Sequence, residues 1–196
     1  VLHGDISDRV SITASARYNE YDGPVNNWAR EMGTPGNLQY PFTLDTNLNP
    51  THQRETFGAR FEINAEFDNF DFKSITSYTD TESDRHTDVD LTQLWFFNTF
   101  RPETMEVLTQ EFRFSSNSDG PLQWVGGFYL MDFEETMNSF LDFGWIILEA
   151  DDPSVHVQVP FETRREDKGN LAAFGNVTYE TGPWEFGLGL RIDRWE

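Results

Sequence analysis

Apolar and polar residues alternate along several long stretches of this chain, and this period of two constrains the fold more than any other feature. From Val10 to Tyr18 every second residue is apolar and the residues between are polar or charged. The same pattern runs from Phe57 to Phe67. Successive side chains of a β-strand point to opposite faces. Each stretch therefore predicts a strand with one apolar and one polar face.

The alternation predicts seven strands, joined by connections that are in turn long and short. We place the strands at residues 6–21, 55–67, 70–80, 106–116, 122–136, 170–180 and from 184 onward. The long connections are then 22–54, 81–105 and 137–168. The Asp119-Gly120 pair in one short connection is a strong signal for a hairpin turn. Short turns at one end and long loops at the other are typical of an antiparallel, up-and-down transmembrane β-barrel with periplasmic turns and extracellular loops.

The number and length of the strands indicate part of a large barrel. Bacterial barrels close with an even number of strands, eight or more, so seven strands would leave two open edges. A strand of about 16 residues reaches about 50 Å and exceeds a hydrocarbon layer about 30 Å thick. We therefore interpret residues 1–196 as an internal piece of one β-barrel domain. The alternative is a soluble sandwich of seven strands, although sandwich strands are usually shorter.

Composition excludes several classes of protein. The formal net charge is −20, which argues against a nucleic-acid partner because phosphate binding needs a basic surface. The chain has no cysteine, so disulfides and thiolate metal sites are excluded. No run of residues approaches the roughly 18 apolar positions of a membrane-spanning helix.

Three stretches, residues 72–90, 108–135 and 171–196, resemble the barrel of TonB-dependent outer-membrane receptors. The most specific is the second, with QEFR at 110–113, the Asp-Gly turn, and WVGGFY at 124–129. This resemblance implies a barrel of about 22 strands with a plugged lumen, in the outer membrane of a Gram-negative bacterium. We expect the plug, the TonB box and the terminal strand to lie outside residues 1–196.

The resemblance also implies a function and partners. Such receptors import a scarce ligand, namely a ferric siderophore, cobalamin or a glycan, with energy supplied through TonB. The barrel would contact outer-membrane lipid and lipopolysaccharide. The alternatives are a passive porin-like channel and a soluble β-rich binding protein.

No motif in the sequence indicates catalysis, and we expect neither an enzyme nor a bound cofactor. None of the four histidines has the spacing of a metal-binding motif. His86 lies among acidic residues at 84, 88 and 90, where we expect a solvated acidic segment in preference to a metal site. Aromatic side chains in the long connections are the candidates for ligand contact, because they can stack on sugars or siderophore rings. We select Trp28, Tyr40, Trp95, Phe143 and Trp145; the alternative is that they pack the loops against each other.

Overall fold

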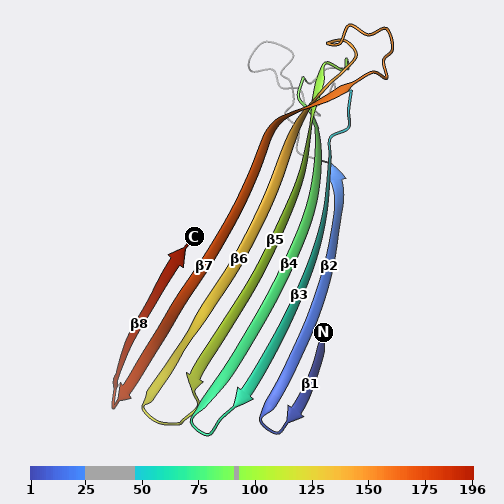
Figure 1. Ribbon diagram of the computed structural model, residues 1–196. Coiled ribbons are helices and arrows are strands. Elements are labelled where there is room, and N and C mark those ends of the chain that lie inside the picture. The colour runs from blue at the N-terminus through green and yellow to red at the C-terminus, as the bar shows by residue number, and fades with distance from the viewer. Residues whose placement is uncertain (25–46, 91–92) are drawn as a thin grey trace.

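A computed structural model describes residues 1–24, 47–90 and 93–196. The described residues form one antiparallel sheet of eight strands, in which every strand pairs with its neighbours in sequence. Figure 1 shows the sheet as a single curved layer, with β1 and β8 at its two edges. The strands are β1 (Leu2–Ser7), β2 (Val10–Pro24), β3 (Thr51–Glu66), β4 (Phe70–Asp88), β5 (Phe97–Ser116), β6 (Leu122–Phe143), β7 (Val157–Thr181) and β8 (Trp184–Trp195).

The up-and-down topology predicted from the alternation is confirmed, and no second sheet packs on the first within the described residues. The soluble sandwich therefore does not describe this fold. Turns of two to five residues join β1 to β2, β3 to β4, β5 to β6 and β7 to β8 at one end of the sheet (Figure 1). The strand ends that the other three connections join lie at the opposite end of the sheet, which we call the outer end. In the last short turn Gly182 has φ +58°, a conformation that favours glycine.

The structure has eight strands, one more than the seven predicted. The predicted first strand, 6–21, is divided by a tight turn at Asp8 and Arg9. The Ser7 hydroxyl accepts a hydrogen bond from the Arg9 amide at 3.3 Å, and the Arg9 guanidinium pairs with Asp68 at 2.7 Å in the next short turn. Ser7, Asp8 and Arg9 are three consecutive polar residues that interrupt the alternation, and the prediction of one strand over 6–21 ran through this turn signal.

Six strands, β2 to β7, extend further than predicted at the outer end, and four of them do so by seven residues or more. β4 continues to Asp88, β5 starts at Phe97, β6 continues to Phe143 and β7 starts at Val157. Most of this added length was predicted as loop, because polar residues there occupy both faces. Alternation reports a strand only where one face is apolar, and these segments lack that asymmetry.

The register divides the sheet into an apolar face and a polar face. Tyr18 pairs with Phe57 and Ala14 with Phe61, so the apolar side chains of β2 and β3 lie on the same face. The apolar side chains of this face form a band, which we call the apolar band. It comprises alternate residues of Val10–Tyr18, Phe57–Ala65, Phe72–Tyr78, Leu108–Phe114, Leu122–Leu130, Leu171–Tyr179 and Trp184–Ile192. Within these ranges the band is interrupted by three polar side chains, since Gln110 hydrogen-bonds to Thr76 and Ser74.

The sheet has almost no buried apolar core among the described residues. Ala172, at 1% exposure, is the only hydrophobic residue counted as buried there, whereas Leu188 is 78% exposed and Phe128 is 53% exposed. Soluble monomers rarely leave so extended an apolar surface in water, and such a surface marks an interaction site.

Candidate functional site

The outer edge of the apolar band crosses the strands at a slant. On β2 the band ends at Tyr18. When the cross-strand pairs are followed from β2 to β7, Tyr18 lines up with Asp167 of β7. On β8 it ends at Ile192, which pairs with Ala173 of the same β7. Ala173 lies six residues along β7 from Asp167. The edge of the band therefore shifts by six residues over the six strand-to-strand steps from β2 to β8. A shift of one residue, about 3.3 Å along the strand, for each strand spacing of about 4.8 Å corresponds to a strand tilt of about 35°. This tilt is within the range of membrane barrels.

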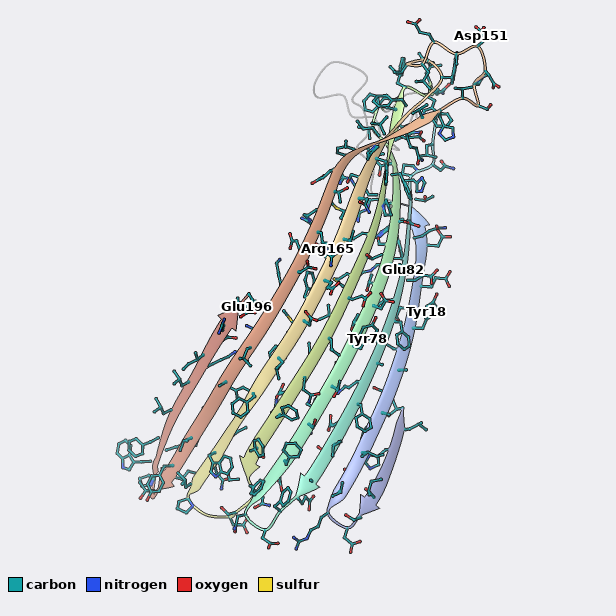
Figure 2. The ribbon with its side chains drawn as sticks, viewed as in Figure 1. Tyr18, Tyr78, Glu82, Asp151, Arg165 and Glu196 are labelled. Atoms are coloured by element: carbon teal, nitrogen blue, oxygen red, sulfur yellow. The ribbon has the colours of Figure 1, made fainter. Side chains whose placement is uncertain are left out.

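Tyrosines and carboxylates meet at the outer edge of the band. Tyr18 donates a hydrogen bond to Glu55 Oε2 at 2.8 Å, and Tyr78 donates one to Glu106 Oε2 at 3.3 Å. Figure 2 shows both tyrosines part of the way along their strands. On five neighbouring strands, the next residue on this face beyond the band is acidic, namely Glu20, Glu55, Asp80, Glu106 and Asp132. The face therefore changes abruptly from apolar to negatively charged.

The opposite face, at the level of the band, carries ion pairs. Glu62 is bound by Arg60 at 2.8 Å and by Lys73 at 2.9 Å, and Arg191 pairs with Asp193 at 2.8 Å. These side chains are partly solvent-exposed, so each pair contributes little to stability. Their abundance marks this face as one suited to water, in contrast to the apolar band.

Trp95, one of the predicted ligand-contacting residues, holds two outer connections together. Its ring stacks on the imidazole of His156, with centroids 5.0 Å apart and planes at 27°. His156 Nδ1 lies 2.8 Å from Asp142 Oδ1 at the end of β6. A Cβ added to Gly144 would lie 2.4 Å from Trp95 Cγ, so this glycine makes room for the indole. The contacts support the packing alternative for Trp95.

The other predicted aromatic residues are placed as follows. Phe143 ends β6 and its ring lies 6.5 Å from that of Phe97 on β5, so it belongs to a strand and not to the predicted loop. Trp145 follows in the connection and is partly exposed. Trp28 and Tyr40 lie outside the described residues. The structure thus brings Trp95 and Phe143 to the same end of the sheet without testing ligand contact.

Two titratable groups at the outer end have shifted pKa values. Burial lowers the pKa of His52, and the positive charges of Arg85 and Arg54 lower it further. Hydrogen bonds from the Ser154 amide and hydroxyl, at 2.9 and 2.8 Å, lower the pKa of Asp152. His52 lies on the polar face, where its ring Nε2 is 2.9 Å from the Ser83 hydroxyl.

The sequence analysis missed a group of basic side chains on the polar face at the outer end. Arg85 of β4 and Arg101 of β5 are register partners, yet both positions were predicted to lie in the connection 81–105. Both were missed because polar residues occupy both faces of 81–88 and 97–105, so no alternation marks these segments as strands.

In the described part of the chain, no group of three or more histidine and carboxylate side chains is arranged to hold a metal ion. No helix of the described residues is long and apolar enough to cross a membrane.

Comparison with solved structures gives a similarity of fold. No family model matches the sequence, and no curated protein matches it. The crystal structure of the ferric yersiniabactin uptake receptor FyuA from Yersinia pestis superposes with a TM-score of 0.61 at 13% sequence identity. The match covers 95% of this chain and 31% of the receptor. At this identity the likeness concerns the fold, and the chain spans less than a third of the length of that receptor.

Proposed function

We propose that this chain forms part of the barrel wall of an outer-membrane receptor that imports a scarce ligand with energy supplied through TonB. The observation that carries the proposal is the similarity of nearly the whole sheet, 95% of the chain, to the ferric yersiniabactin uptake receptor FyuA. The sequence stretches that resemble TonB-dependent receptors lie in the same sheet and support the same assignment.

The apolar band supports a membrane location. In this proposal the band faces lipid and the polar face lines the lumen. Removing a leucine or phenylalanine side chain from water stabilises a fold by about 1.5–3 kcal/mol, and lipid offers this gain to exposed residues such as Phe128 and Leu188. The slanted edge of the band also agrees with strands tilted by about 35° in a bilayer.

The ligand class we favour is a ferric siderophore, with cobalamin or a glycan as the alternatives. In this arrangement the outer end of the sheet stands outside the membrane, next to lipopolysaccharide. The long β7 reaches from Thr181 to Val157, which at about 3.3 Å per residue exceeds any bilayer crossing. The strands therefore project outward and carry their connections to where a ligand would be captured.

The test is to express the full reading frame in a Gram-negative host and measure membrane location and uptake together. We expect the protein in the outer-membrane fraction, with heat-modifiable electrophoretic mobility, and uptake of a ferric siderophore that is lost in a host lacking TonB. Uptake without TonB would support a passive porin-like channel. Recovery in the soluble fraction without detergent would overturn the membrane assignment.

A further inference from the structure

Most basic side chains of this chain are neutralised by a neighbouring acid, but three that stand together are not. The chain has 14 lysines and arginines, and Arg30 lies outside the described residues. Of the other thirteen, nine form an ion pair. Among the four that form none with any described residue, three lie on the polar face at the outer end, namely Arg54, Arg85 and Arg101.

The register places these three side chains close to one another. His52 pairs with Arg85, which pairs in turn with Arg101. Arg54 lies two residues along β3 from His52, so it projects from the same face. Like charges directly opposite on neighbouring strands destabilise a sheet. A sheet that keeps Arg85 and Arg101 as partners is therefore suited to an anion that compensates both.

Among the described residues on this face of the sheet, the cluster keeps a net positive charge. The acids nearest in register are Glu103, opposite Ser83, and Glu162, opposite Ser139. Neither of these acids forms an ion pair with a described residue. The cluster contrasts with a chain whose formal net charge is −20.

A buried hydroxyl in the same register row adds a second observation. The register between β5 and β6 pairs Phe100 with Phe140 and Glu103 with Met137. Ser139 of β6 therefore lies opposite Arg101 of β5. Ser139 is 0% exposed, and its Oγ has no hydrogen-bond partner within the described structure. Buried polar atoms almost always have a partner, so the unsatisfied Ser139 hydroxyl marks a place beside Arg101 where a polar partner is missing.

We propose that Arg54, Arg85 and Arg101, with His52 and Ser139, form a binding site for a small ligand that carries two or more carboxylate or phosphate groups. Guanidinium groups bind both kinds of anion through paired hydrogen bonds. The inference rests on the proposed function, because the polar face lines the lumen only if the sheet belongs to a barrel. It deepens that function by making the imported ligand anionic.

The test is equilibrium binding of radiolabelled citrate and of radiolabelled pyrophosphate to the full-length protein in detergent micelles. We expect saturable binding of at least one of the two, which weakens as salt rises from about 0.05 M to about 0.5 M because salt screens charge. In the triple variant R54Q/R85Q/R101Q the affinity falls about tenfold or more, since hydrogen bonds to charged groups are strong. Preference for citrate identifies a carboxylate ligand, and preference for pyrophosphate identifies a phosphate ligand.

A matched control variant is R9Q/R17Q/R194Q, which removes the same charge from positions outside the cluster. We expect this control to bind as the unmodified protein does. Equal loss in both triple variants would overturn the site, because it would show a general effect of charge. If the protein is found in the outer membrane with heat-modifiable mobility yet binds neither probe, the anion site is wrong and the proposed function stands. If it is not found there, the proposed function fails on its own test.

Discussion

The phenol of Tyr18 on β2 donates a hydrogen bond of 2.8 Å to Glu55 on β3 at the level where the apolar band ends. Toward the short turns the same face presents Ala16 and Phe61, and beyond the pair it presents Glu20. An aromatic ring with a polar tip is suited to a boundary between hydrocarbon and water. The pair therefore fixes the outer limit of the surface that we assign to lipid.

Leu188 lies in the middle of the part of the apolar band on β8 and is 78% exposed. If this face contacts lipid, Leu188→Arg should lower the free energy of unfolding by about 2–4 kcal/mol, the cost of a basic side chain near the membrane midplane. The measurement is reversible unfolding of the full-length protein from lipid vesicles.

The matched control is Thr178→Arg, on the polar face of β7 beside the partner of Leu188. It should change the free energy of unfolding by no more than about 0.5 kcal/mol, as for an ordinary surface substitution. Equal effects of the two substitutions would show that the two faces of the sheet meet the same solvent.

Trp95 connects two outer connections through its stack on His156 and its contact with Gly144. Trp95→Ala should therefore increase the rate at which a protease cleaves residues 144–156, because local opening costs less when packing is lost. Ile147→Ala, at a position 49% exposed in the same segment, is the control and should leave the rate unchanged. Cleavage at the normal rate in Trp95→Ala would contradict the packing role.

The titration of His52 should make the free energy of unfolding decrease as the pH falls below about 6.5. The pKa of His52 is lowered by burial first and by Arg85 and Arg54 next, so the unfolded chain takes up a proton at a higher pH than the folded one. The stabilisation from neutral His52 is complete above the ordinary pKa of about 6.5 and decreases as the pH falls below it.

The titration of His52 can be followed by NMR of labelled histidine. In Arg85→Gln the pKa of His52 should rise toward its ordinary value, because one repelling charge is gone. In Arg17→Gln, a distant arginine on the same face, it should not change. An unchanged pKa in Arg85→Gln would mean that Arg85 does not lie over the imidazole.

The strands that could be predicted from the sequence are those with one apolar and one polar face. Val10–Tyr18 and Phe57–Phe67 belong to this kind, and there the predicted and observed strands agree closely. β1 was missed because the interruption of the alternation at residues 7–9 is only three residues long. The outer parts of β4 to β7 were missed because polar residues on both faces remove the periodic signal.

The predicted ligand-contacting residues were chosen by residue type, and their contact with a ligand stays a prediction. Trp95 is used in contacts between connections, whereas Phe143 lies in a strand. The cluster of Arg85 and Arg101 depends on cross-strand register. Both residues were predicted to lie in a loop, and a loop has no such register, so the pairing could not be predicted.

The central claim is that one face of this sheet contacts lipid and the other contacts water. Since the chain has no cysteine, single cysteines carrying spin labels can be placed along β3 from Phe57 to Ala65 in the full-length protein in outer membranes. The account predicts that labels at Phe57, Ala59, Phe61, Ile63 and Ala65 collide preferentially with oxygen, and that labels at the residues between them collide preferentially with a water-soluble nickel complex. Equal accessibility of the nickel complex to both sets would contradict it.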